Sequence, residues 1–409
     1  MLNLEEKKQF SDILEELGNV LDITEKQHAE VVNRYQGVGN WLAQSDSSLS
    51  AYKPEIIPQG SFLLGTSIKP VHEDDELDVD LVCRLEGKQA DWCQYDLKQK
   101  IGQRLVDSGK YGNMLDEEGR RCWTLKYAEG TKFHMDILPA LVAHDYDIIL
   151  ERALKLSDSK TLDQLSIRIT DKEMANYKTA VNPEYWPKSN PFGYAKWFTE
   201  QASLNNKRMI MLSESVKPIP KYTREKLPLQ RIVQILKRHR DIMFEGNADK
   251  PVSCIITTLA ARAYQKEENI IDGLLNVIDC MPLFIEERIV PNTSMKTIWI
   301  SNPINQEENF ADKWPANPQK QTNFYNWLRQ LKKDILFTVE QRGLTNIQNS
   351  LGNAFGKSII NETFKSYGNK SLLLREGGKQ FMTPNSGILS TTASRIKVPN
   401  HNFYGKKPQ

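Results

Sequence analysis

Cysteine is scarce in this sequence, and its distribution excludes two kinds of site. The 409 residues contain five cysteines, which form no Cys-x-x-Cys pair and show no zinc-ligand spacing. An odd and scattered set argues against a disulfide framework and is typical of a protein in a reducing cytosol. The five are Cys83, Cys93, Cys122, Cys254 and Cys280.

Long apolar runs and a strong excess of one charge are also missing. The N-terminus lacks the pattern of a signal peptide, and no apolar run approaches the length of a transmembrane helix. The 54 basic and 52 acidic residues leave a net charge of +2, which is not the balance of a protein that coats nucleic acid, although local basic patches remain open. We therefore expect a soluble, cytoplasmic enzyme without membrane contact.

The most informative stretch is residues 58–82, where a Gly-Ser pair precedes an alternating acidic and apolar run. The alternation over residues 77–82 predicts a strand with Asp78 and Asp80 on one face, their Cα atoms roughly 6.6 Å apart. Two carboxylates on a buried strand repel each other unless cations lie between them. Mg²⁺ suits this position because it takes hard oxygen ligands and keeps coordination sites open for phosphates. An isolated Asp-x-Asp, however, is more often a solvated strand face.

Two neighbouring features favour the metal site over a solvated face. Gly60 and Ser61 lie upstream, where a bare backbone and a hydroxyl can hold a triphosphate. A third acid, Asp136, lies on the second strand of a predicted hairpin, which turns at residues 129–131 and is expected to end at Pro139. The order Gly-Ser, Asp-x-Asp and a lone Asp resembles the nucleotidyltransferase signature of the polymerase-beta-like superfamily.

Helices are expected at the N-terminus. Apolar residues recur at helical spacing over residues 4–21, and Thr24 and Gln27 match a capping box for a second helix. This region is either a spine that spans two lobes or plain packing helices, and the sequence leaves both open. Residues 163–170 alternate and favour a further strand. The prolines of residues 185–191 predict an ordered loop, where we place the lobe boundary.

Beyond residue 199 the pattern is almost wholly helical. Pro228 fits the first position of a helix, and the basic side chains that follow are expected to decorate its surface. Ser253 would fall in the first turn of the next helix, where free backbone N–H groups favour an anion. Lys237 and Ser253 could grip a triphosphate together, although alone they are more simply a solvated lysine and a capping residue. The basic set is Arg231, Lys237, Arg238, His239 and Arg240.

Three segments, residues 186–198, 229–241 and 251–261, resemble the bacterial CD-NTases. These are the cyclic GMP–AMP synthase (DncV-like) and oligoadenylate synthetase-like enzymes of antiphage CBASS operons. The resemblance implies an α+β, bilobed nucleotidyltransferase with a mixed β-sheet palm and a C-terminal helical lobe, and an active site in the cleft. It divides the chain into a palm with N-terminal spine helices (1–185), a helical lobe (186–400) and a C-terminal tail (401–409).

The resemblance also implies a reaction and roles for single residues. The reaction joins ATP with ATP or GTP into a cyclic di- or trinucleotide messenger for antiphage defence and releases pyrophosphate. Two Mg²⁺ ions, or Mn²⁺ in their place, would be the cofactors. Gly60 and Ser61 match the phosphate-binding turn, Asp78, Asp80 and Asp136 match the catalytic, metal-binding acids, and Lys237 and Ser253 match the positions that hold the donor triphosphate.

Partners follow from the same resemblance. Nucleoside triphosphates are the expected substrates, and a ubiquitin-transfer-like (E1/E2-like) or HORMA-type protein from the same operon is the expected regulator. No Cys/His cluster matches the zinc-bearing insertion of the vertebrate DNA-sensing enzyme, which argues against a nucleic-acid activator. The tail 401–409 is either conjugated to targets or an ordinary frayed terminus, and its final residue, Gln409, favours the second.

Two other function classes remain open. A terminal nucleotidyltransferase acting on RNA or tRNA, or one making linear oligoadenylate, would share the palm and would need a broad basic groove. A catalytically inactive scaffold on the same fold is the third class, and the intact acids argue against it. The side chains that select the base cannot be located from the sequence pattern.

Overall fold

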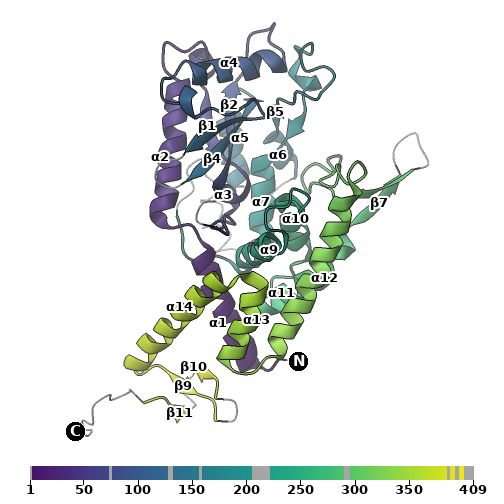
Figure 1. Cartoon of the computed structure of the whole chain (residues 1–409). Coiled ribbons are helices and arrows are strands. Elements are labelled where there is room, and N and C mark those ends of the chain that lie inside the picture. The colour runs from purple at the N-terminus through teal and green to yellow at the C-terminus, as the bar shows by residue number, and fades with distance from the viewer. Residues whose placement is uncertain are drawn as a thin grey trace.

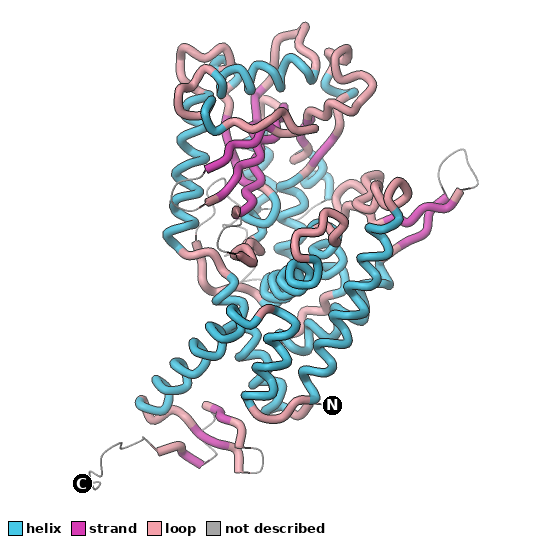
Figure 2. The backbone as a smooth tube through the Cα atoms, viewed as in Figure 1, coloured by secondary structure: helices cyan, strands magenta, loops and turns pink. Residues whose placement is uncertain are grey.

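The computed structural model describes residues 2–72, 76–127, 132–155, 159–204, 222–289, 295–384, 387–391 and 396–399. They form an α+β, bilobed molecule, in which a sheet-containing palm lies above a lobe made mostly of helices (Figure 1). Most strand residues gather in the palm, and helices dominate below it (Figure 2). Within the described part of the chain, no helix combines the length and the apolar character needed to cross a bilayer.

The palm is built on a six-stranded mixed sheet with the order β1-β2-β4-β5-β6, in which β3 pairs with β4. Strands β2 and β4 pair in parallel, whereas the other neighbouring pairs of this sheet are antiparallel. The predicted hairpin of β3 and β4 is confirmed, and its expected turn at residues 129–131 lies outside the described residues. The strands are β1 Glu55–Pro58, β2 Leu77–Glu86, β3 Trp123–Tyr127, β4 Phe133–Val142, β5 Ile167–Ile169 and β6 Lys188–Ser189.

The prediction that Pro139 ends β4 is wrong, because the strand continues beyond it. Proline is disfavoured inside sheets since it has no N–H to donate. The Pro139 carbonyl points away from β2 and accepts a hydrogen bond from the Thr170 N–H at 3.3 Å. On that side the pairing of β4 with β3 stops at Ile137, and its pairing with β5 starts at Ala140. Pro139 therefore occupies the gap between these two strands, where a missing N–H costs no ladder hydrogen bond.

The helical lobe is centred on α9 (Pro228–Phe244), which packs against the helices around it. One apolar core joins this lobe to one face of the sheet, and a second core lies on the other face of the sheet, under α2 and α4. The helices are α1 Leu4–Leu21, α2 Glu25–Leu42, α3 Gly60–Leu64, α4 Gln94–Val106, α5 Tyr146–Lys155, α6 Ser159–Gln164, α7 Pro191–Ala202, α10 Ser253–Ala263, α11 Ile270–Cys280, α12 Pro318–Glu340, α13 Leu344–Phe355 and α14 Lys357–Glu376, with 3₁₀ turns at Ser50–Tyr52, Gly112–Met114, Pro183–Tyr185 and Met281–Phe284.

Two expectations about strands need correction. The strand expected at residues 163–170 is only β5, because α6 takes up the start of that range. The region beyond residue 199 is not wholly helical, since it also contains a hairpin of β7 and β8 and a small sheet of β9, β10 and β11. Strands this short give too few residues for alternation to be recognised. They are β7 Glu286–Ile289, β8 Lys296–Trp299, β9 Phe381–Met382, β10 Leu389–Ser390 and β11 Ile396–Lys397.

The first N-terminal helix has the bounds expected from the sequence, the second begins at its predicted cap, and both begin with capping boxes. Thr24 and Gln27 exchange hydrogen bonds that start α2 directly after the break that ends α1. The helices serve different lobes (Figure 1): α2 packs against β1 and α4 in the palm, whereas α1 packs against α9, α11 and α14 in the helical lobe. The N-terminal segment thus runs from one lobe into the other.

The basic side chains predicted on the surface of α9 are buried instead. Arg231 is fully buried and donates to Asp22 Oδ2 at 2.7 Å and to Glu15 Oε1 at 3.0 Å. A Cβ on Gly18 would lie 2.4 Å from the Arg231 Cδ, so α1 approaches α9 closely at this point. The sequence cannot distinguish Arg231 from a solvated cation, because its carboxylate partners lie more than two hundred residues away in the chain.

Replacing Arg231 with alanine is expected to lower the free energy of unfolding by about 3–5 kcal/mol, because the buried Asp22 then loses its close cation and retains a longer contact, at 3.6 Å, with Lys226. Urea denaturation followed by circular dichroism measures the change. Lys332→Ala is the matched control, since Lys332 pairs with Asp279 at 2.8 Å while both side chains are more than half exposed, and such a pair contributes at most about 1 kcal/mol. Equal losses in the two variants would contradict the structural role of Arg231.

Candidate active site

Three carboxylates converge where β2 and β4 pair. Burial alternates along the start of both strands, so Asp78 and Asp80 share one face of β2 and the apolar residues between them point into the core. The parallel register sets Asp80 directly opposite Asp136 of β4. Neighbouring strands lie about 4.8 Å apart. The structure therefore brings together the three acids that the sequence singled out.

Asp80 lies against the Gly-Ser turn. Gly60 has a φ of +58°, in the left-handed region, and a Cβ there would meet Asp80 Oδ2 at 2.4 Å. Glycine is needed here because of the positive φ and because of the close approach of Asp80. Burial, followed by the charges of Asp78 and Asp136, raises the pKa of Asp80 to about 7. A divalent cation relieves this crowding of carboxylates, so the set of oxygen donors fits a metal site.

Two side chains beside the acids were missed by the sequence reasoning. Thr124 of β3 donates its hydroxyl to Asp136 Oδ1 at 2.6 Å and orients that carboxylate. His134 lies opposite Asp78 in the register, with its Nε2 3.2 Å from Asp78 Oδ1 and its Nδ1 3.3 Å from Glu76 Oε2. The signal for His134 was its place two residues before Asp136, which puts both on one face of the strand.

Asp78, His134 and Asp136 offer ligand atoms that lie within 4.8 Å of one another and form a candidate metal site. The hydrogen bond with Asp78, together with the negative charge of that carboxylate, raises the pKa of His134 to about 9 despite its partial burial. The imidazolium therefore stands beside Asp78 where a metal cation would also be attracted. Binding of a metal and protonation of His134 compete for the same carboxylate.

The Gly-Ser turn continues into a segment, residues 64–70, that faces α9. Ser61 Oγ lies 3.1 Å from Ser67 Oγ, and the Thr66 N–H donates to the Ser61 carbonyl at 2.9 Å, which folds the turn back on itself. Buried carbonyls need hydrogen-bond donors, and side chains on and just before α9 supply them. Gln230 donates to Leu64, Lys226 to Gly65, Lys237 to Thr66, Gln234 to Ser67, and Arg238 to Lys69 and Pro70.

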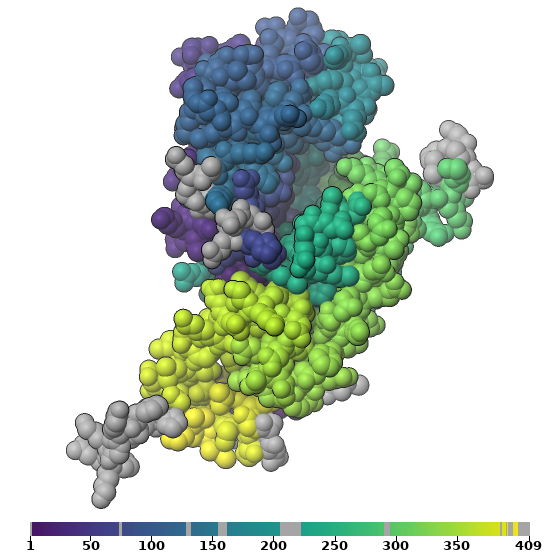
Figure 3. All heavy atoms as spheres, in the orientation of Figure 1, coloured from purple at the N-terminus to yellow at the C-terminus, as the bar shows by residue number. Residues whose placement is uncertain are grey.

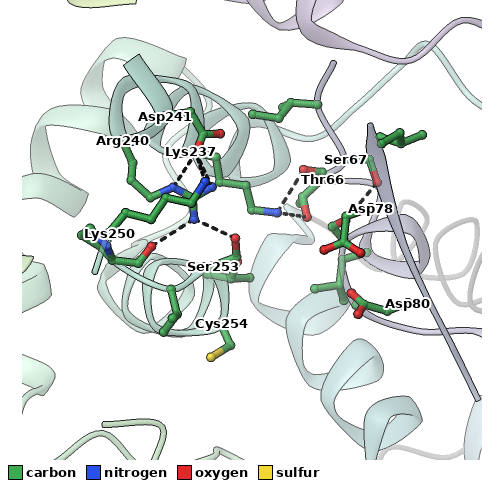
Figure 4. Close-up of a pocket in the computed structure, with 18 of the residues that line it drawn as sticks. Thr66, Ser67, Asp78, Asp80, Lys237, Arg240, Asp241, Lys250, Ser253 and Cys254 are labelled. Carbon is green, nitrogen blue, oxygen red and sulfur yellow. Dashed lines mark hydrogen bonds and ion pairs between the residues drawn. The ribbon is translucent and has the colours of Figure 1, made fainter. Parts of the chain in front are cut away.

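Lys237 and Ser253 lie on the helical-lobe side of the site (Figure 4). Lys237 Nζ donates to the Thr66 carbonyl at 3.2 Å and to its Oγ1 at 3.3 Å. Burial, followed by the charge of Arg240, lowers the pKa of Lys237 to about 8. Ser253 begins α10, and its Oγ accepts a hydrogen bond from Arg240 Nη1 at 2.8 Å. Arg240, which the sequence reasoning placed on the surface, is thus a second buried cation beside the site.

A cavity of about 850 Å³ opens between the two lobes, where Figure 3 shows the surface hollowed. Its walls combine the carboxylates and the turn of the palm with the cations of α9. Asp136 lies beside Asp80 but is not among the lining residues. The predicted site residues that line the cavity are Gly60, Ser61, Asp78, Asp80, Lys237 and Ser253.

Asp78→Asn is expected to lower the pKa of His134 from about 9 toward its ordinary value of 6.5, because the variant removes the charge that stabilises the imidazolium. Folding raises the pKa of His134, so the His134–Asp78 pair stabilises the fold fully when the pH lies below the ordinary pKa of histidine. This stabilisation is lost as the pH rises through the raised pKa. An NMR titration of the His134 ring in metal-free protein measures the shift. Asp145→Asn, at an exposed position, is the control, and an unchanged titration in Asp78→Asn would contradict the pairing.

The amino-acid sequence is similar to a known domain family and to named proteins. Residues 5–158 match the model of the Second Messenger Oligonucleotide or Dinucleotide Synthetase (SMODS) domain. A c-di-GMP synthase of Roseivirga ehrenbergii is 27% identical over 331 residues, which cover 80% of this chain and 79% of that protein. The cyclic dinucleotide synthase CdnG of Bradyrhizobium diazoefficiens is 22% identical over 376 residues, which cover 87% of this chain and 82% of that protein.

Solved structures show the same fold. The Bradyrhizobium diazoefficiens CD-NTase CdnG, solved in complex with GTP, superposes with a TM-score of 0.63 at 18% identity, covering 88% of this chain and 99% of that one. Escherichia coli MS115-1 CdnC, solved in a complex with a HORMA protein, gives a TM-score of 0.53 at 13% identity and covers 83% of this chain and 94% of that one. With a SMODS match over residues 5–158 and a fold shared over most of its length, the chain is similar to the bacterial CD-NTases.

Proposed function

We propose that this chain is a cyclic dinucleotide synthase that joins two nucleoside triphosphates, with GTP among its substrates. The observation that carries the proposal is the position of Asp78, Asp80 and Asp136 on adjacent strands, where Asp78 and Asp80 line a cavity whose other wall carries Lys237. The relatives named above as a c-di-GMP synthase and as a cyclic dinucleotide synthase support it.

The reaction consists of two equivalent transfers. In each, a ribose hydroxyl oxygen forms a bond to an α-phosphorus, the bond from that phosphorus to the β-phosphate oxygen breaks, and pyrophosphate leaves. The second transfer closes the ring. Such reactions depend mainly on positioning and on neutralising charge, so the contribution of each residue follows from where it is held.

The three acids fit divalent metal ions, and Asp78, Asp80 and Asp136 would hold them. Two bound Mg²⁺ ions, with Mn²⁺ as the alternative, supply the positive charge that stabilises the attacking and leaving oxygens. Thr124 fixes one carboxylate oxygen of Asp136. The other oxygen is the acceptor for the proton of the attacking ribose hydroxyl.

The triphosphate lies between the turn and α9 in this proposal. Gly60 has no side chain to obstruct the phosphates, and Ser61 presents a hydroxyl at the same turn. Lys237 and Ser253 close the site from the helical lobe, with Arg240 adding charge behind Ser253. Lys237 and Arg240 thus come from the helical lobe, whereas Asp78, Asp80 and Asp136 come from the palm.

A protein regulator and a role in antiphage defence remain predictions for this chain. The named complex of Escherichia coli CdnC with a HORMA protein concerns that protein, and it motivates a test of a HORMA-type partner here. Co-purification of the chain with the products of its neighbouring genes tests both the HORMA-type and the ubiquitin-transfer-like partner. The tail at residues 401–409, on which conjugation would depend, lies outside the described residues.

The function is tested by incubating the purified chain with radiolabelled nucleoside triphosphates and Mg²⁺, followed by phosphatase. Small products that resist phosphatase support the cyclic dinucleotide synthase. Label that moves into added RNA would instead identify a terminal nucleotidyltransferase. Absence of any product would identify an inactive scaffold.

The double variant Asp78→Asn, Asp80→Asn is expected to release pyrophosphate at least about a thousandfold more slowly, the effect of losing about 4 kcal/mol of transition-state stabilisation. The cause is the loss of the anionic ligands that would hold the metal ions. A coupled pyrophosphate assay with GTP, ATP and Mg²⁺ measures the rate. The exposed variant Asp145→Asn should keep its activity, and near-normal turnover of the double variant would remove these acids from the mechanism.

Affinity for a nonhydrolysable triphosphate is expected to fall as the pH rises through about 8, because Lys237 loses its proton there and no longer attracts the phosphates. Lys237→Met should bind weakly at every pH and lose this dependence. Isothermal titration calorimetry between neutral and alkaline pH measures both. A wild-type affinity that stays constant across this range would show that Lys237 does not contact the triphosphate as a cation.

A further inference from the structure

The wall of the cavity carries a carboxylate that the proposed reaction does not use. Glu308 and Asn302 line the cavity, together with Thr257 on α10 and Phe310, which follows Glu308 in the loop after β8. Neither Asn302 nor Glu308 was singled out by the sequence, since both lie in a connection without a periodic pattern. Their position in the wall of the cavity is visible only in the folded structure.

The loop holds Glu308 in a defined position. The Asn302 side chain donates from Nδ2 to Glu308 Oε2 at 2.7 Å, and the Asn302 N–H donates to the Glu308 carbonyl at 2.9 Å. Asn302 is itself buried, and its Oδ1 accepts from the Ile304 N–H at 3.0 Å. Hydrogen bonds therefore hold both the amide nitrogen and the amide oxygen of Asn302, and the nitrogen positions the Glu308 carboxylate. A side chain fixed in this way is suited to recognition because little of its freedom remains to be lost on binding.

The charges on the cavity wall differ in their partners. Lys237 and Arg240 lie where the triphosphate is placed, whereas Glu308 forms no ion pair among the residues that the structure describes. A carboxylate without a cation would repel phosphates and attracts hydrogen-bond donors instead. The neighbouring walls include the ring of Phe310 and the ring of Tyr194, which pack edge to face with centroids 6.3 Å apart. An aromatic wall beside an acceptor pair suits a flat heterocycle that carries donors on one edge.

We propose that Glu308, positioned by Asn302, recognises the Watson–Crick edge of a guanine base, a proposal that rests on the function proposed above. Guanine presents two adjacent donors there, N1–H and the N2 amino group, and an ionised carboxylate has two acceptor oxygens for them. Adenine presents only its N6 amino group beside an N1 lone pair, which would face a carboxylate oxygen. The pair therefore selects GTP over ATP at this position, with Glu308 as the contact and Asn302 as the positioning residue.

The substitution Glu308→Gln tests the contact. Glutamine has nearly the same shape and can still accept from Asn302, but it replaces one acceptor by a donor and so matches adenine better than guanine. We expect affinity for the α,β-methylene analogue of GTP to fall about ten- to a hundredfold, the usual discrimination of a bidentate base contact, while affinity for the ATP analogue stays or improves. Isothermal titration calorimetry on the full chain gives both values. Glu307→Gln, at the exposed neighbouring position, is the matched control and should change neither.

Two further measurements keep the proposal testable if Glu308→Gln folds poorly. The unaltered protein should bind the inosine analogue, which lacks the N2 amino group, several-fold more weakly than the guanosine analogue. Asn302→Ala should reduce the ratio of GTP-analogue to ATP-analogue affinity, a readout that general destabilisation would not move. Equal binding of inosine and guanosine analogues, or a parallel loss for both bases in Glu308→Gln, would overturn the proposal.

Failure of this inference can be told apart from failure of the proposed function. A chain that forms phosphatase-resistant products but binds adenine and guanine analogues equally would keep its function and lose the role of Glu308. A chain that releases no pyrophosphate with any nucleoside triphosphate would lose the function itself.

Discussion

The arrangement of the site depends on hydrogen bonds between the side chains of α9 and the carbonyls of residues 64–70. An irregular segment can be buried only if its polar backbone groups find partners. Here side chains on and just before α9 donate to carbonyls of the segment that follows the Gly-Ser turn. These bonds join the palm to the helical lobe and fix the separation between the carboxylates on one wall and the cations on the other.

The carboxylates themselves are placed by a different constraint, the parallel pairing of β2 with β4. Parallel register sets Asp80 opposite Asp136, and the short antiparallel strand β3 brings Thr124 to the same point. The close approach of Gly60 to Asp80 then joins the two constraints, because the turn that begins the segment bound by α9 also covers the acids. Placement of the acids therefore comes from the sheet, and placement of the cations Lys237 and Arg240 comes from the helix.

The sequence predicted much of this arrangement because the relevant patterns are local. Alternation identified β2, a turn with flanking strands identified the hairpin that carries Asp136, and a capping box identified the start of α2. The basic residues of α9 were misplaced because a cation that bonds a distant buried carbonyl has the same local pattern as a solvated one. Asn302 and Glu308 depend on chain segments meeting in space, and Pro139 depends on where neighbouring strands stop, so no local pattern could reveal them.

The break between α1 and α2 has a consequence for how the molecule assembles. The SMODS match begins within α1, yet the apolar side of that helix is covered by α9, α11 and α14, which lie beyond the end of the match. Residues 5–158 consequently do not cover the apolar side of α1 by themselves. During synthesis the first helix to emerge must wait for partners made near the end of the chain, so its apolar stripe stays exposed until the C-terminal helices arrive.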